Sequence, residues 1–582
     1  MLKAHRKLIL ILALVFVSLF LRFYKLGSDP VGLYYDEVDL GYQARSILET
    51  GRDYLGTLSP FYVNSFVELR TPIPAYATAI TTAIFKTPEL QVRAPSAILG
   101  TVVVVLIFVL LDIWTENFAL AFIVALVFAF NPWQLQFSRF SHEANSLMTF
   151  FLLGLIFFFK GIKQGSYKKF LLATIFLSLD VYTYRTMSLY LPVVVLGLII
   201  IYRKEIWKLG IKKLSGLVLI GAVIVLPFLY TTTIGSADTP RAKQLALFSE
   251  QSLPVFVQRD REVDSNDYAD PTIGKKASQL SYFFHNKPLS WLRVFTENYY
   301  SAFSMDFLFL KGDLNQRQSI GEIGELYYID ILALIAGFYF VGTHLKKKHF
   351  QFLVLYLLTS PIPSALTFDG GGHAGRLFIY SGALLIVVGL GWWWIFDKVR
   401  KLRFSKFFMA TILGAWLLMF VFYLHRYYVH YPIDSSRSWG YGFKQAIADI
   451  DKYQKDYKEV LMFPTADPPM MYYLFWSNTP PKQVQEYGSN FSPDHIEGKP
   501  LDKFKVGEVN LKDKNDPTQF MEPGVLYLVT PDDFDADFKE NMKERVGLPK
   551  AMKILDQINY PDNIPAFYLI TKDATVKAST TK

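Results

Sequence analysis

Two adjacent carboxylates, Asp36 and Glu37, directly follow the aromatic pair Tyr34 and Tyr35 in the segment Val-Gly-Leu-Tyr-Tyr-Asp-Glu-Val-Asp-Leu-Gly-Tyr (31–42). Adjacent carboxylates by themselves are more often a solvated loop or a helix cap than a site of chemistry. A carboxylate held against aromatic and apolar neighbours, however, loses hydration and gains basicity. Such a group suits a general base, so this segment is the first candidate for chemistry.

A second signal is a single arginine in each of three short polar stretches, with hydrogen-bonding side chains close by in the sequence. These arginines and their neighbours are Arg139 with His142 and Glu143, Arg185 with Tyr184, and Arg376 with His373. A phosphate at a membrane surface would fit such sets, and a lipid headgroup or a carboxylate such as Glu143 would satisfy each arginine equally well. His142 and Glu143 could also bind a divalent cation. Two adjacent residues are a poor ligand set, so no obligatory metal or other cofactor is expected.

A longer polar stretch between apolar runs contains Asp306, Asp313 and Arg317. These side chains could line a cleft, and a solvated loop explains them equally well.

The composition indicates where these residues must be positioned. Of 582 residues, 52% are hydrophobic and only 19% are charged, which is too apolar for a water-soluble protein of this size. The apolar residues form long runs separated by short basic stretches, as in a multi-pass membrane protein. The net charge of +9 could suggest a nucleic-acid partner, but the basic residues cluster at the ends of apolar runs, so membrane topology explains them and no nucleic acid is expected. The chain has no cysteine, which excludes disulfides, thiolate metal sites and cysteine nucleophiles.

About eleven membrane-spanning helices are expected, in an α-helical multi-pass fold. The apolar runs are 8–21, 94–114, 118–136, 145–160, 170–184, 189–202, 214–231, 326–343, 350–366, 377–396 and 407–424. No small-residue cleavage site follows the first run, so it is expected to be retained as a helix.

Four loops rich in lysine and arginine, near 160–169, 203–213, 346–348 and 398–406, are expected to be cytoplasmic. The amino terminus is then cytoplasmic and the carboxyl terminus lies outside a plasma membrane. The segment Thr71 to Phe85 is short and contains two prolines, so it is expected to be a helix on the outer surface rather than a span.

This topology divides the chain into a membrane domain over 1–425, with outer loops 27–93 and 232–325, and an extracytoplasmic domain over 426–582. The tail alternates a helix-like stretch, 444–455, with strand-like stretches, 459–463, 525–530 and 566–571, so a small α/β domain is expected.

Together these features resemble the GT-C membrane glycosyltransferases. The motifs that carry the resemblance are the Asp-Glu pair in a long first outer loop, a following surface helix, the segment Arg93-Ala-Pro-Ser-Ala-Ile-Leu-Gly entering the next span, and a second outer loop with Ser-Arg and an acidic residue. The branch that looks most similar contains the protein O-mannosyltransferases and the aminoarabinose transferases of lipid A. The resemblance covers about 1–425.

The resemblance implies a polyprenyl-phosphate sugar as donor and a first-loop Asp as base. By position, Asp36 would be that base and Glu37 its companion, and Glu143 would be the second acidic residue. Arg185, Tyr184, His373 and Arg376 correspond by loop position to donor-phosphate groups, and His142, Glu143 and Arg139 to further contacts with acceptor, donor or metal.

The function expected is therefore transfer of a hexosyl or pentosyl group to a hydroxyl of a protein, lipid or glycan acceptor on the outer face, with inversion. The alternative is a transporter or flippase for lipid-linked glycans. Transporters tend to place charged residues near the bilayer midplane. Here the polar residues gather near one face, which favours an enzyme.

Overall fold

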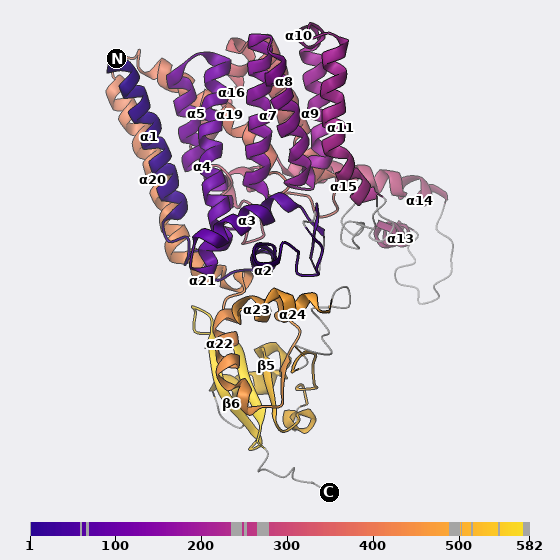
Figure 1. The fold of residues 1–582 in the computed structure, drawn as a ribbon. Helices are drawn as coiled ribbons and strands as arrows, with labels where there is room; N and C mark the ends of the chain where they lie inside the picture. The colour runs from indigo at the N-terminus through magenta and orange to yellow at the C-terminus, as the bar shows by residue number, and fades with distance from the viewer. Residues whose placement is uncertain are drawn as a thin grey trace.

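The computed structural model describes residues 2–58, 61–65, 69–233, 247–248, 253–264, 279–487, 501, 503–513, 516–544 and 548–573. Its larger part is a bundle of roughly parallel helices (Figure 1). The bundle helices are α1(Leu2–Phe23), α4(Pro88–Thr115), α5(Phe118–Phe130), α7(Ala144–Gln164), α8(Tyr167–Leu179), α9(Thr186–Ile201), α11(Ile211–Thr233), α16(Asp330–His344), α17(Lys347–Thr359), α19(Phe378–Val399) and α20(Ser405–His425).

Each of the eleven expected apolar runs overlaps a different one of these helices, although three runs extend into a following short helix. In the described part of the chain, five helices are long and apolar enough to cross a membrane, namely α4, α7, α11, α19 and α20 with its continuation to Asp434. The number of eleven spans therefore stays a prediction. The helices α5, α9 and α16 are apolar but shorter.

Two of the expected runs are broken by proline. The run 118–136 divides at Asn131, whose side chain accepts the backbone N–H of Gln134 at 3.1 Å and so caps α6(Pro132–Phe137). The run 350–366 divides after α17, and Pro361 precedes the short α18(Ile362–Ala365). Both breaks lie next to polar segments that the candidate site uses.

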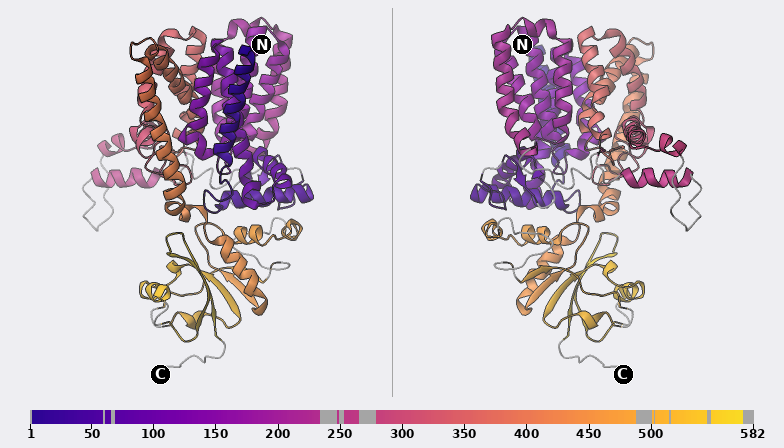
Figure 2. Two further views of the ribbon diagram at one scale, coloured as in Figure 1. Left: turned by 90° about the vertical axis from the view of Figure 1, so that its left-hand side faces the viewer. Right: turned by 90° about the vertical axis from the view of Figure 1, so that its right-hand side faces the viewer.

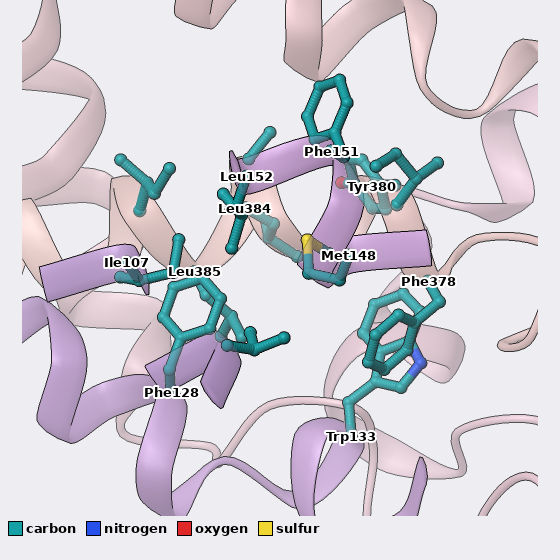
Figure 3. Packing of buried hydrophobic residues seen from close by; sticks show 14 of the residues in the cluster. Ile107, Phe128, Trp133, Met148, Phe151, Leu152, Phe378, Tyr380, Leu384 and Leu385 are labelled. Carbon is teal, nitrogen blue, oxygen red and sulfur yellow. The ribbon is translucent and has the colours of Figure 1, made fainter. Parts of the chain in front are cut away.

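The bundle has a tightly packed apolar interior (Figure 3). Side chains at most 1% exposed come from five helices: Ile107, Phe128, Trp133, Met148, Phe151, Leu152, Phe378, Tyr380, Leu384 and Leu385. Glycines let α16 and α19 approach closely, since a Cβ at Gly391 would lie 1.7 Å from the carbonyl oxygen of Ala333. This packing fixes the helix ends that lie opposite the amino terminus, from which the polar loops of the candidate site emerge.

Several shorter helices lie at or near the end of the bundle opposite the amino terminus, among them α2(Tyr35–Thr50), α3(Pro72–Ile84), α13(Leu253–Asp264), α14(Gln279–Phe284) and α15(Lys287–Ser301). The helix α3 matches the expected surface helix. Its exposed side chains Tyr76, Ile80 and Ile84 are four residues apart and form one apolar stripe, as expected of a helix lying on a bilayer. A two-stranded hairpin, β1(Val63–Asn64) and β2(Leu69–Arg70), leads into α3.

The remaining short helical segments connect the larger elements. They are η1(Asp180–Tyr182), α10(Arg203–Trp207), η3(Asp306–Leu310), η4(Arg426–His430), α21(Tyr431–Asp434), η5(Ser436–Trp439), η6(Gln454–Asp456), η8(Pro517–Phe520) and η9(Pro531–Asp533).

The C-terminal region contains a five-stranded mixed sheet with strand order β4-β3-β5-β7-β6. The strands are β3(Glu459–Met462), β4(Phe504–Val506), β5(Val525–Val529), β6(Met552–Asn559) and β7(Pro565–Lys572), and the helices are α22(Phe443–Tyr453), α23(Pro469–Trp476), α24(Pro481–Gln485) and α25(Ala536–Glu544). The expected helix and three strands of the tail are present, while β4 and β6 were not expected. This region lies at the end of the bundle opposite the amino terminus (Figure 2).

Candidate active site

The candidate site is built on the first turns of α2, which begins at Tyr35 with Tyr34 as its N-cap residue. Helical spacing separates the acidic residues of this helix. Asp36 and Asp39, three residues apart, share one face, while Glu37 points about 100° away from Asp36. The aromatic ring of Tyr34 packs edge-on against the buried Trp439 at 5.3 Å between ring centroids. The acidic turn is therefore fixed by aromatic packing, as the sequence predicts.

Asp36 is held by Arg70 of β2. The Arg70 guanidinium forms an ion pair with Asp36 and donates from Nε to Asp39 Oδ2 at 2.5 Å. The Asp36 side chain is 35% exposed, whereas that of Arg70 is 7% exposed. Asp39 also accepts the hydroxyl of Tyr54 at 2.9 Å, and burial raises the pKa of Asp39 although Arg70 opposes the rise. Of these two carboxylates, Asp36 is therefore the one that a substrate can reach.

Glu37 has a different role from the expected one. Both Glu37 and Arg93 are fully buried, and two nitrogens of the Arg93 guanidinium donate to the two Glu37 oxygens at 3.0 Å. The backbone N–H of Ser141 adds a third hydrogen bond to Glu37 at 2.9 Å. Arg93 also donates to the carbonyl of Pro30 at 2.8 Å. Glu37 therefore joins α2, α4 and the loop before α7, and the structure gives it a structural role rather than that of a companion base.

His142 and Glu143 lie beside Arg70 and its two carboxylate partners. Glu143 Oε1 is 3.9 Å from Arg70 Nη1, and burial raises the pKa of Glu143. The backbone N–H of Ala144 donates to His142 Nδ1 at 3.1 Å, so a proton on this ring resides on Nε2. Burial lowers the pKa of His142 to about 4, which keeps the ring neutral. The ring of Tyr184 packs edge-on against that of His142 at 5.4 Å.

The loop that contains Gly370, His373 and Arg376 approaches this cluster from the other side. A Cβ at Gly375 would lie 3.0 Å from His142 Nε2, which shows how closely the loop passes. Burial lowers the pKa of His373 to about 3, the nearby charge of Arg376 lowers it further, and Asp369 opposes this shift. The backbone N–H of Arg376 donates to His373 Nδ1 at 3.3 Å, which leaves Nε2 as the donor of a neutral ring.

The Arg376 guanidinium is paired within its own loop. It donates to the two oxygens of Asp369 at 2.6 and 3.3 Å and to Thr367 Oγ1 at 2.8 Å. The Asp369 side chain is 52% exposed, and its pKa is lowered by Arg376 in spite of partial burial. Asp313, whose pKa burial raises to about 6, accepts the N–H of Ala374 at 2.8 Å and holds the loop in place. A phosphate that binds Arg376 must therefore share the guanidinium with Asp369.

The two other expected arginines have different environments. Arg185 is half-buried near Tyr62, where its charge opposes the rise in the pKa of Tyr62 that burial causes. Arg139 is 2% exposed and lies outside the site: it donates to the carbonyls of Leu21 and Asp29 at 2.8 and 3.1 Å and to the hydroxyl of Tyr427 at 3.0 Å. Arg139 thus ties α1 to η4, the segment that follows α20, and these contacts favour a structural role. Its expected contact with acceptor, donor or metal stays a prediction.

The structure brings together Asp36, Glu143, His142, Tyr184 and His373, while Glu37 and Arg139 serve the fold. No group of three or more metal-ligating side chains occurs in the described ranges. Sequence reasoning missed Arg70, which ends β2 just before α3, on the expected outer side. The argument applied to the arginines of the short loops, that a positive charge there needs a partner, would have found it.

Comparisons with known proteins complete the description of this site. Residues 69–230, which include Arg70, Arg93, His142, Glu143 and Arg185, match the family model described as dolichyl-phosphate-mannose-protein mannosyltransferase. No curated protein matches the chain.

Solved structures match much more of the chain. ArnT from Cupriavidus metallidurans bound to undecaprenyl phosphate is 13% identical with a TM-score of 0.50, and the match covers 98% of this chain and 99% of that one. An oligosaccharyltransferase from Archaeoglobus fulgidus tethered with an acceptor peptide is 14% identical with a TM-score of 0.49, covering 82% of this chain and 63% of that one. The chain thus spans less than two thirds of the archaeal protein. The family match and the fold shared with ArnT confirm the resemblance of this chain to the GT-C membrane glycosyltransferases.

Proposed function

We propose that the chain is an integral-membrane glycosyltransferase that moves a sugar from a polyprenyl phosphate to an acceptor hydroxyl on the outer face. The observation that carries the proposal is the position of Asp36. It is a partly exposed carboxylate at the aromatic start of α2, anchored by Arg70, at the outer end of an apolar bundle. A lipid-linked donor reaches such a place from the bilayer, and a polar acceptor reaches it from water.

The general base in this proposal is Asp36. It takes the proton of the acceptor hydroxyl as the oxygen attacks the anomeric carbon, and the bond from that carbon to the phosphate oxygen breaks. A single displacement of this kind inverts the anomeric centre. Arg70 fixes the carboxylate, since its guanidinium binds both Asp36 and Asp39. General-base catalysis then needs no movement of α2.

Negative charge develops on the departing polyprenyl phosphate. Arg376 and Arg185 supply positive charge near this leaving group, and the neutral His373 ring and the Tyr184 hydroxyl supply hydrogen-bond donors. His142 lies between the acceptor side of the site and the leaving-group side, because it contacts Tyr184 and closely approaches the loop of His373. The acceptor side at Asp36 and the leaving-group side at His373 are thereby neighbours, as a direct displacement requires.

The similar proteins support the choice of donor. ArnT was solved with undecaprenyl phosphate, and the family that residues 69–230 match uses dolichyl phosphate mannose by its description. We infer a polyprenyl-phosphate hexose or pentose as donor, without an obligatory metal. The proposal also places the protein in the plasma membrane, with the amino terminus in the cytoplasm.

The test uses the full chain in liposomes with a panel of radiolabelled polyprenyl-phosphate sugars and a membrane extract of the source cells as acceptor. Release of free polyprenyl phosphate is expected with at least one donor. Asp36→Asn should lower this release by about 10²- to 10⁴-fold, because it keeps the shape of the side chain and removes the base. A flippase would move the donor between leaflets without releasing polyprenyl phosphate, so the absence of release with every donor would refute the proposal.

A further inference from the structure

The order of the strands in the C-terminal sheet reverses direction at β3. Strand β3 pairs in parallel with β4 on one side and with β5 on the other. The chain therefore leaves β3, adds β4 at one side and then adds β5 at the opposite side. In open α/β sheets, ligands bind outside the carboxyl ends of the strands at this kind of reversal.

The loop at the carboxyl end of β3 contains Asp467. The hydroxyl of the buried Tyr472 donates to Asp467 Oδ2 at 3.2 Å, which fixes the carboxylate. Burial raises the pKa of Asp467, the charge of Arg317 opposes this rise, and the charge of Asp36 adds to it. Asp467 thus lies in the same electrostatic neighbourhood as the candidate base, although 431 positions separate Asp36 from Asp467 in the chain.

Arg317 faces the same place from the stretch between α15 and α16. Its guanidinium lies 4.8 Å from the ring centroid of Tyr34, the N-cap residue of α2. In the part of the chain that the structure describes, no carboxylate lies within ion-pair distance of Arg317, so its N–H groups are not committed to a fixed ion pair. The side chains of Asp36, Arg317, Asp467 and Tyr472, called the junction below, come from three separate parts of the sequence.

The junction has a fixed geometry because α2 packs into the apolar core of the C-terminal region and is tied to the bundle by the buried Glu37–Arg93 ion pair. Tyr35, Val38 and Tyr42 of this helix are buried in the same cluster as Met470 and Met471 of α23. The fit is close: a Cβ at Gly41 would lie 2.5 Å from the ring of Phe475.

Hydrogen bonds between α2 and the C-terminal region fix the orientation of this packing. Tyr42 donates from its hydroxyl to the carbonyl of Thr479 at 3.1 Å, and Gln485 donates to Ser46 Oγ at 3.0 Å. The helices α23 and α24 of the C-terminal region are therefore seated on the helix that carries the candidate base (Figure 1).

We propose that the acceptor binds at the junction, where Asp467 positions it and determines its specificity. This inference rests on the proposed function. Arg70 balances the charge of Asp36, and the Asp467 carboxylate accepts hydrogen bonds. The group that Asp467 holds next to the acceptor hydroxyl is therefore a hydrogen-bond donor such as hydroxyl, amide or ammonium. The C-terminal region is then part of the acceptor site and not merely an appended domain.

The test measures donor and acceptor dependence separately, with the full chain in liposomes. The donor is the polyprenyl-phosphate sugar that the wild type uses, and the acceptor probe is a membrane extract of the source cells. Asp467→Asn should raise the extract concentration needed for half-maximal transfer by about ten-fold or more, since a hydrogen bond to a charged acceptor is lost. The half-saturating donor concentration should stay within about two-fold, because the donor phosphate lies on the side of His373.

Two further variants separate positioning from folding. Asp467→Glu keeps the charge and should recover part of the acceptor dependence. Asp532→Asn is the matched control, because Asp532 is an 83% exposed carboxylate of the same region, and it should leave both dependences unchanged. Asp467→Asn retains an oxygen that can accept the Tyr472 hydroxyl, so the sheet should keep its thermal stability.

One outcome would overturn the acceptor inference alone, and another would overturn the proposed function. An acceptor dependence of Asp467→Asn within about two-fold of wild type, or a change confined to the donor, overturns the inference while polyprenyl phosphate is still released. If the wild type releases none with any donor, the proposed function itself has failed, and this outcome is distinguished by the wild-type reaction alone.

Discussion

Glu37→Gln should destabilise the protein, whereas Asp36→Asn should leave its stability unchanged. The two carboxylates are neighbours in sequence, but Glu37 is fully buried against the fully buried Arg93 and receives three hydrogen bonds of 2.9 to 3.0 Å. Glutamine cannot balance the Arg93 charge. Breaking a buried ion pair by removing one partner costs about 3–5 kcal/mol. That free energy corresponds to an increase of roughly 100- to 5,000-fold in the ratio of unfolded to folded protein.

The assay heats each variant in detergent and measures the fraction that remains monodisperse by size-exclusion chromatography. Glu49→Gln is the matched control on the same helix, because the Glu49 side chain is 43% exposed and its ion pair with Arg45 spans one helical turn. Such a pair contributes at most about 1 kcal/mol, so the control should behave like the wild type. A Glu37→Gln protein that is as heat-stable as the wild type but inactive would refute the structural role and return Glu37 to the chemistry.

Three further variants test the rest of the site. Arg376→Ala should lower the donor kcat/KM by about ten- to a hundred-fold, as for loss of a hydrogen bond to a charged group, with partial recovery by Lys; a change confined to the acceptor would contradict the phosphate assignment. Because folding lowers the pKa of His142 from 6.5 to about 4, the unfolded chain binds the proton first, and stability is lost as the pH falls from about 7 through 6.5 toward 4. Melting in detergent from pH 7 to pH 5 should therefore be less pH-dependent in His142→Gln, and an equal slope would contradict this. Arg139→Ala should lower heat stability through loss of the bond to Tyr427 and of its carbonyl partners while donor KM stays unchanged; a raised donor KM would place Arg139 in the site.

The helices and the acidic turn could be predicted because their signals are local. Apolar runs of helical length place α4 and α19, and the aromatic pair before Asp36 marks the acidic turn, although the helix α2 that begins there was not expected. The choice between Asp36 and Glu37 is not local. It depends on Arg70 and Arg93, which lie tens of residues away and approach α2 from different sides.

The arginines show the same limit. Sequence reasoning gives Arg139 and Arg376 equal weight, since each is the single arginine of a short polar stretch. The structure satisfies Arg139 with carbonyl oxygens and Tyr427, because the end of α1 packs beside α6, and leaves Arg376 with an acidic partner that is half exposed. Only tertiary packing distinguishes the two.

In the C-terminal region, only the strands with a strong apolar sequence pattern could be predicted. β5 and β7 are long apolar stretches, and both were expected. β4 has only three residues, which is too short for a periodic signal, and β6 contains register shifts near Ile554 and Asp556 that break its alternation. Neither strand could be recognised without its partner in the sheet.

The helix α2 contacts both the bundle and the C-terminal region, and this connects these observations. One face of the helix carries Asp36 and Asp39 toward Arg70, a second carries Glu37 into the bundle, and a third carries Val38 and Tyr42 into the core of the C-terminal region. A base that must meet a lipid-linked donor and a polar acceptor needs a fixed position relative to both. Since the Glu37–Arg93 ion pair ties α2 to the bundle and the C-terminal core holds another face of the same helix, a displacement of either would move Asp36. The chain can therefore place its base accurately only when both parts are folded.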